Sequence, residues 1–212
     1  MKIIDISWPI NQDATEYKDR KTVLFKQNKI FEKDGARDSQ ITMNSHTGTH
    51  VDAPSHFLQD GKPIDQVNLH NCIGKAKVLD FTGVKESVTK ADLQKHDIKK
   101  DDIILLKTKN SFLPVTGPFE KEFIFLKDCG AKYLAEKEIK ALGIDYLGLE
   151  RGQEGHPSHV DLMKKDIVII EGLRLGQVIP GDYFFICLPV RVVGLEAAPA
   201  RAILVPEFYS SF

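Results

Sequence analysis

The chain has 212 residues, of which 42% are apolar and 28% are charged, a composition typical of a soluble protein with a sizeable core. Lysine and arginine total 29 against 30 aspartate and glutamate, so charge gives no case for a nucleic-acid partner. The sequence has no run of 18 apolar residues, which predicts that no segment spans a membrane. The acid at Asp5 comes too early for a signal peptide. We therefore expect one domain over residues 1–212, located in the cytoplasm.

The three cysteines, Cys72, Cys129 and Cys187, are widely spaced and include no C-x-x-C pair. An odd number without such a pair is not typical of a disulfide framework or of a zinc knuckle. We expect three buried thiols in a reducing compartment. A cysteine nucleophile has little support, because no cysteine lies beside a histidine.

The first half of the chain is rich in short β-type segments. Alternating or apolar runs predict strands over residues 3–6, 22–25, 40–43, 77–81 and 103–107. The turn residues 34–37 separate the second strand from the third. Thr89 and Asp92 have the spacing of a capped helix start, and residues 110–118, with Gly117 and two prolines, predict a loop.

The second half mixes helices with strands. Apolar spacing predicts a helix over residues 129–142, ended by Gly143, and then a strand over 144–149. Ser158 is expected to cap a short helix after the polar loop 150–157. Further strands are expected over 166–170, 182–188 and 202–205, with a loop over 194–199. Mostly strands with two or three helices predict a mixed α/β or α+β fold.

Residues 45–56 are the most informative stretch, because His46, His50, Asp52 and His56 fall within eleven positions. Imidazole nitrogen and carboxylate oxygen are the donors that zinc and manganese sites use. The even spacing of the first three would aim them at one face of a strand. In a straight strand the α-carbons of His46 and His50 would be roughly 13 Å apart, so Gly48 is expected to bend the chain between them.

The residues after this stretch are expected to turn back toward it. Pro54 suits the first turn of a helix, which Asp52 could cap, and this turn would bring His56 toward the cluster. Chance clustering of three histidines and an aspartate is the less probable alternative, while His70 and His96 lie outside the stretch and are expected to have no ligand role.

Other candidates lie further along the chain. Glu171 follows an apolar strand, which is a frequent place for site chemistry, although a plain strand-end carboxylate is the alternative. His156 and His159 are rival ligands. Trp8 and Tyr17 could line a substrate pocket or simply pack as aromatic residues.

The string His46-Thr-Gly-Thr-His50-Val-Asp52-Ala-Pro-Ser-His56 resembles the signature of the cyclase family of metal-dependent hydrolases. The resemblance extends to residues 5–7, 159–173, 186–190 and 194–201 and so covers most of the chain. It implies the swivelling β/β/α fold of that family and a homodimer or homotetramer. In the loop after Tyr17 the chain has Lys18-Asp19 where family members acting on kynurenine substrates usually have a Pro-Gly turn. This departure concerns the substrate more than the chemistry.

The resemblance also implies the roles of the site residues. It places His46 and His50 on a first metal ion, Asp52 between two ions, and His159 on the second ion, with Glu171 touching both. The match favours His159 over His156. It leaves His56 as the proton carrier, a task for which a neutral imidazole is well suited. The expected cofactor is Zn²⁺ or Mn²⁺, with two ions per chain.

The implied activity is hydrolysis of an amide-type carbonyl by a metal-bound hydroxide, because a divalent ion lowers the pKa of bound water toward about 7. The leading small-molecule substrate is N-formyl-L-kynurenine, cleaved to L-kynurenine and formate. Opening of a cyclic amide such as isatin, or of a lactone, is the alternative within the same chemistry. A metal-binding protein without turnover is the alternative of another class, although a spare base at His56 argues against a purely structural site.

Overall fold

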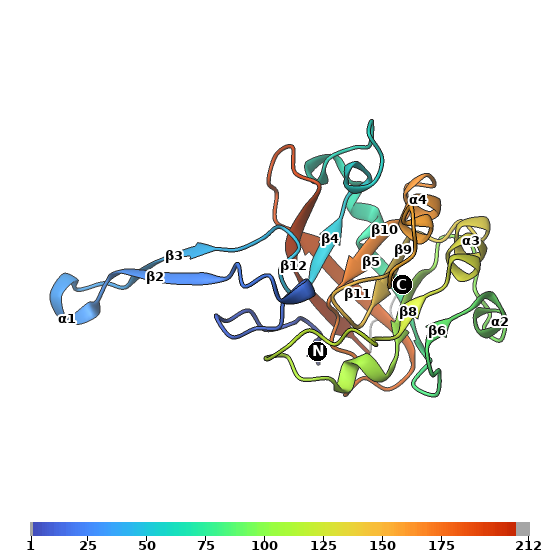
Figure 1. The fold of residues 1–212 in the computed structure, drawn as a ribbon, viewed down its shortest axis with the longest axis horizontal. Helices are drawn as coiled ribbons and strands as arrows, with labels where there is room; N and C mark the ends of the chain where they lie inside the picture. The colour runs from blue at the N-terminus through green and yellow to red at the C-terminus, as the bar shows by residue number, and fades with distance from the viewer. Residues whose placement is uncertain (1, 207–212) are drawn as a thin grey trace.

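The computed structural model describes residues 2–206 and has a mixed eight-stranded sheet at its centre (Figure 1). In spatial order the strands are β1 (Ile4–Asp5), β12 (Ala197–Val205), β11 (Gly181–Pro189), β5 (Ile73–Asp80), β7 (Ile103–Lys107), β9 (Ala141–Ile144), β10 (Val168–Glu171) and β4 (His50–Asp52). Strands β5, β7, β9 and β10 run parallel, and the other pairs are antiparallel. Because β4 pairs with both β10 and β12, the sheet closes into a barrel. The predicted mixed α/β fold is confirmed.

The sheet separates two apolar cores. In β7, Ile103 and Leu105 belong to the core inside the barrel, whereas Ile104 and Leu106 belong to the core outside it. Since successive side chains of a strand point to opposite faces, a strand buried on both faces needs an unbroken apolar run. The sequence of β7 therefore marks it as a central strand.

The outer core lies between the sheet and three helices, α2 (Lys90–Leu93), α3 (Asp128–Glu136) and α4 (Pro157–Met163) (Figure 1). A small parallel pair, β6 (Ser87–Val88) and β8 (Phe125–Leu126), lies next to them. Thr89 and Asp92 form the predicted capping box of α2. Among the described residues, every helix is too short or too polar to cross a membrane.

Short 3-10 helices occupy several of the connections. They are η1 (Tyr17–Asp19), η2 (Pro54–His56), η3 (Ile64–Gln66), η4 (Leu69–Asn71) and η5 (Lys109–Phe112). Two of them, η1 and η2, border the site described below.

A two-stranded arm extends away from the barrel (Figure 1). It consists of β2 (Leu24–Lys29) and β3 (Asp38–Thr42), joined by the helical turn α1 (Phe31–Asp34). Gly35 ends this turn in the left-handed conformation, at φ 64°. All residues of both strands are exposed. The strands expected over 22–25 and 40–43 thus exist with shifted bounds, but they pair with each other outside the main sheet.

The predicted helix over 129–142 is wrong in its second half. Helix α3 ends at Glu136, and Leu142 and Gly143 lie in β9, so the strand expected over 144–149 is also wrong. The apolar spacing of this segment combines a helix face with a buried strand. Gly143 does not stop a helix but allows close packing, because an added Cβ there would overlap side-chain atoms of Leu105 and Leu173.

Three smaller expectations are also corrected. Helix α4 begins at Pro157 with His156 at the N-cap, so Ser158 lies within the first turn and its backbone N–H donates to Glu150. Asp52 ends β4 and does not cap η2, whose N-cap is Ala53. Strand β12 starts at Ala197, inside the region expected to be a loop.

The cysteines differ in exposure. Cys72 and Cys187 are buried as predicted, and burial raises the pKa of the Cys72 thiol to about 11. Cys129 is exposed on α3, so the prediction for it is wrong. None of the three forms a disulfide.

Candidate metal centre

Strand register places two of the predicted ligands opposite each other. In the antiparallel pair of β4 and β10, His50 is the cross-strand partner of Glu171, and Asp52 follows two residues later. Val51, between them, packs inside the barrel, so His50 and Asp52 face outward together. Directly opposed residues have Cβ atoms about 4.5–5.5 Å apart, which brings the three polar side chains into one patch.

Two glycines hold this patch together. Gly48 adopts φ +62° and provides the bend before β4, while Gly172 adopts φ +72° directly after Glu171. An added Cβ at Gly172 would overlap the carbonyl oxygen of Gly48, so the two backbones can meet only without a side chain there. Thr49 fastens the contact, because its hydroxyl donates to the Gly172 carbonyl over 2.6 Å.

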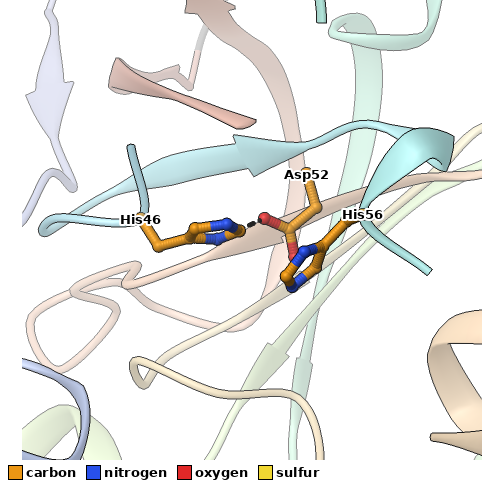
Figure 2. Close-up of side chains that lie close together, drawn as sticks. All are labelled: His46, Asp52 and His56. Carbon is orange, nitrogen blue, oxygen red and sulfur yellow. Dashed lines mark ion pairs between the residues drawn. The ribbon is translucent and has the colours of Figure 1, made fainter. Parts of the chain in front are cut away.

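His46 and His56 reach the same carboxylate from either end of β4 (Figure 2). Nδ1 of His46 lies 3.0 Å from Oδ1 of Asp52. Pro54 at the start of η2 turns the chain back, and the His56 ring packs 4.3 Å from the His46 ring, measured between centroids. The predicted return of His56 toward the cluster is confirmed.

His159 comes from α4 and completes the cluster. Its Nε2 lies 3.4 Å from Oε1 of Glu171 and 3.9 Å from Oδ2 of Asp52. The structure thus brings together all six residues expected for catalysis and metal binding, although they come from three separate stretches, residues 46–56, α4 and β10.

The atoms at the middle of the cluster have only imperfect partners. Nε2 of His50 and both carboxylate oxygens of Asp52 are buried, and among the described residues none gives them a hydrogen bond of good geometry, although Nδ1 of His46 lies 3.0 Å from Oδ1 of Asp52. Nε2 of His50 lies 3.4 Å from an oxygen of Asp52 and of Glu171, but without hydrogen-bond geometry. A buried carboxylate without a partner is costly. A divalent ion satisfies these nitrogen and oxygen donors together, so the residues fit a metal centre.

Asp52 belongs to two possible ligand groups. One group joins it to His50 and Glu171 and the other to His46 and His56, and in each the candidate ligand atoms lie within 4.8 Å of one another. A carboxylate with two free oxygens between two groups is suited to touching two ions.

The far nitrogens of two histidines have partners that orient the rings. Nδ1 of His50 donates to the carbonyl oxygen of Gly48 over 2.9 Å. Nδ1 of His159 donates to Oε2 of Glu150 over 2.5 Å. Each bond uses the Nδ1 proton and directs Nε2 at the cluster, so that Nε2 can bind an ion once its own proton is released, which is how outer carboxylates and carbonyls prepare histidine ligands.

Sequence reasoning missed two acidic residues that contact these histidines. Glu150 accepts from His159 and from the backbone of Ser158, but in the sequence it is only an acid at the start of a polar loop. Glu196 lies 3.3 Å from Nε2 of His46, with Ser45 donating to the same oxygen over 2.6 Å. The contact of Glu196 joins residues far apart in the sequence, and that of Glu150 depends on how α4 folds back over the preceding loop, so no local pattern indicates either.

Charges in the cluster are strongly coupled. Burial lowers the pKa of His50, but Asp52 and Glu171 overcome this effect and raise it to about 10. For His159, burial is likewise outweighed by Glu150, Glu171 and Asp52, and its pKa also rises to about 10. Without an ion, protons therefore take its place, and metal binding must release them.

A cavity of about 510 Å³ opens above the cluster. Tyr17 lines it, together with Phe57, His56 and Glu171. Trp8 does not, because it is only 2% exposed, and its ring packs 6.0 Å from Tyr146 between centroids. The structure thus brings Tyr17 to the pocket and places Trp8 in an aromatic core.

The other three histidines of the chain have contacts of their own. His156 is exposed, stacks on Phe57 at 4.4 Å between centroids, and approaches Glu150 to 3.1 Å. His70 is exposed in η4, and His96 packs against Phe81. Neither His70 nor His96 approaches the cluster.

Known proteins share this architecture. A sequence model described as putative cyclase matches residues 4–151. The chain is 30% identical to a kynurenine formamidase of Bacillus mycoides (strain KBAB4) over 205 residues, 96% of this chain and 97% of that protein. It is 34% identical to cyclase-like protein 3 of Oryza sativa subsp. japonica over 178 residues, 80% of this chain but only 66% of the relative.

Solved structures agree. A potential metal-dependent hydrolase with cyclase activity superimposes with a TM-score of 0.86 at 42% identity, covering 96% of each chain. Isatin hydrolase A from Labrenzia aggregata, bound to benzyl benzoate, gives a TM-score of 0.82 at 19% identity, covering 97% of this chain and 94% of that one, a likeness of fold alone. The matched sequence model and the full-length relatives lead to one conclusion: the chain belongs to the cyclase family.

Proposed function

We propose that the protein is a metal-dependent hydrolase that cleaves the formyl amide of an aryl substrate, with N-formyl-L-kynurenine as the leading candidate. The observation that carries the proposal is the set of buried donor atoms of His50 and Asp52, which lie against His46, His159 and Glu171 in the wall of an open cavity. Near full-length similarity to kynurenine formamidases supports the choice of substrate.

In this proposal two ions, Zn²⁺ or Mn²⁺, are held by the clustered side chains. His46 and His50 would hold the first ion and His159 the second, and Asp52 and Glu171 would serve both. When bound, the ions supply a more acidic water and a positive charge beside the substrate carbonyl. His156 stays outside this set, because it is exposed and meets only Glu150 among the acidic residues.

His56 is proposed to move the proton. Burial lowers its pKa, and the nearby His46 and His159 lower it further against the opposing effect of Asp52 and Glu171. A neutral imidazole on the cavity wall can take a proton from the attacking water and return it to the leaving nitrogen. The amine then departs neutral, and the formic acid that remains releases its proton to the solvent to give formate.

The deciding experiment is a screen of metal-replete protein against N-formyl-L-kynurenine, formanilides, isatin and lactones. Hydrolysis is measured as release of formate for the formyl amides and as ring opening for the cyclic compounds. We expect the formyl anilides to have the highest kcat/KM. Faster opening of isatin or lactones would favour the cyclic-substrate alternative, which the shared fold with isatin hydrolase supports. No turnover with a full complement of metal would mean a binding protein and overturn the proposal.

Removing the Glu150 carboxylate, which accepts from Nδ1 of His159, should weaken metal binding. We expect Glu150→Gln to lower the affinity for Zn²⁺ by roughly 10- to 100-fold, because a carboxylate that orients a ligand histidine also raises its basicity. A competition titration with a chromogenic chelator measures this change. Glu154→Gln, in the same loop but exposed, is the matched control. Equal affinities for both variants would contradict the role of Glu150.

We also propose that the protein works as a homodimer or homotetramer in the cytoplasm. An isolated two-stranded ribbon is marginal in water, yet the arm exposes Phe25 and its cross-strand partner Ile41. Covering these side chains with a second copy would stabilise the arm. Light scattering should therefore give a smaller mass for Phe25→Ser with Ile41→Ser than for the control Lys26→Ser. A monomeric parent protein would contradict the proposal.

A further inference from the structure

Two cations border the cavity above the metal centre. Lys18 and Arg20 both line it, and both are exposed. Within residues 2–206 neither forms an ion pair with a carboxylate, and each instead lies over the Tyr17 ring, at 5.1 Å for Lys18 Nζ and 5.7 Å for Arg20 Cζ from the ring centroid. Two neighbouring positive charges thus border the cavity without a carboxylate partner in the described part of the chain.

The backbone that carries them is held in an unusual shape. Lys18, Asp19 and Lys21 have φ values of 54°, 57° and 54°, the left-handed region that residues other than glycine enter only at an energetic cost. Such strain persists only where the surroundings impose it. This segment includes η1 and is the loop in which Lys18-Asp19 replaces the Pro-Gly turn that is usual in family members acting on kynurenine substrates.

Two carboxylate acceptors, one buried and one exposed, fix this shape. Glu16, which is buried, accepts from the backbone of Thr22 over 2.6 Å and of Val23 over 3.2 Å. Asp19 accepts from the backbone of Phe119 over 2.8 Å. These bonds fix the loop on both sides of Arg20, so the two cations are set at the cavity by the fold.

Among residues 2–206, the acidic side chains that line the cavity form no ion pair with these cations. Glu16 accepts from the loop backbone, Glu150 from His159 and Ser158, and Glu171 from the backbone N–H of Leu149, and all three are buried. Lys18 and Arg20 are exposed, so the charges that an incoming substrate meets along this part of the cavity are positive. A cavity of about 510 Å³ has the size of small-molecule sites.

We propose that Lys18 and Arg20 form an anion subsite that selects aryl amides carrying a carboxylate away from the scissile bond. This inference rests on the proposed function, since it concerns the other end of the same substrate. Tyr17 provides an aromatic surface between the two cations, against which the aryl part of the substrate packs.

The test compares two formyl amides that differ only in charge, 3-(2-formamidophenyl)propanoate and its primary amide. We expect the parent protein to favour the anion in kcat/KM by roughly 3- to 20-fold, the size expected for two exposed charge contacts. Lys18→Gln with Arg20→Gln should raise KM for the anion by that factor, leave kcat nearly unchanged, and have no effect on the neutral amide. Added salt should reduce the preference in the parent protein only.

The matched control is Lys26→Gln with Lys33→Gln, which removes the same charge from the arm and should retain the preference. Lys18→Arg, which keeps the charge and changes the shape of the side chain, should also retain the preference for the anion, since the charge is what matters. If both amides are hydrolysed with equal kcat/KM, the subsite is refuted while the hydrolase proposal stands. If neither is hydrolysed by metal-replete protein, the proposed function itself fails.

Discussion

Replacing His56 by Asn should lower kcat by about 10²- to 10⁴-fold while the metal content per chain stays nearly the same. An amine is a poor leaving group without a proton, so the loss of a positioned acid affects the chemical step. Binding of the substrate uses other surfaces, and KM should change much less than kcat. Elemental analysis and steady-state kinetics on the same preparation measure both quantities.

His56 could also act as a metal ligand, and the same variant distinguishes the two roles. It shares a possible ligand group with His46 and Asp52, so its ring could instead hold an ion. Loss of an ion together with activity in His56→Asn would make His56 a ligand. Unchanged turnover would move the proton-transfer role to another group, with Glu171 the first candidate. His70→Asn, which alters an exposed histidine far from the cluster, is the control and should change neither quantity.

The parts of the site that the sequence predicts are those that depend on local geometry. The period of a strand places His50 and Asp52 on one face, Gly48 provides the bend, and Pro54 turns His56 back. The family resemblance added His159 and Glu171 and is confirmed by the matched cyclase model and the full-length relatives. The ligand roles of these residues stay predictions.

The parts that the sequence does not predict depend on distant contacts. Glu150 reaches His159 because α4 folds back over the loop before it, and the order of residues alone does not indicate this. Trp8 joins an aromatic core whose members lie more than a hundred positions away, such as Tyr146. The error at Leu142 has another cause, because a short apolar strand directly after a helix mimics a continued helical period.

Replacing Asp52 by Asn should lower metal content from two ions per chain to fewer than one. Outer residues that only orient a ligand already cost about 10- to 100-fold in affinity, and a carboxylate shared by both ions should cost more. Asp52 is buried between His46 and His50, with Nδ1 of His46 3.0 Å and Nε2 of His50 3.4 Å from its Oδ1, and no second carboxylate takes its central position. Asn keeps the volume and removes the charge, which separates coordination from packing.

The expected result has a second, independent readout in stability. An ion that binds only the folded protein raises its unfolding free energy, by about 2.7 kcal/mol at one hundred times the dissociation constant. The melting temperature of the parent protein should therefore rise with added Zn²⁺, and that of Asp52→Asn should not. Asp60→Asn, which alters an exposed aspartate, is the matched control and should respond like the parent.

Unchanged metal content in Asp52→Asn would contradict the assignment of Asp52 to both ions. The companion pair His159→Ala and His156→Ala extends the test, because only the true ligand should reduce metal content when it is removed.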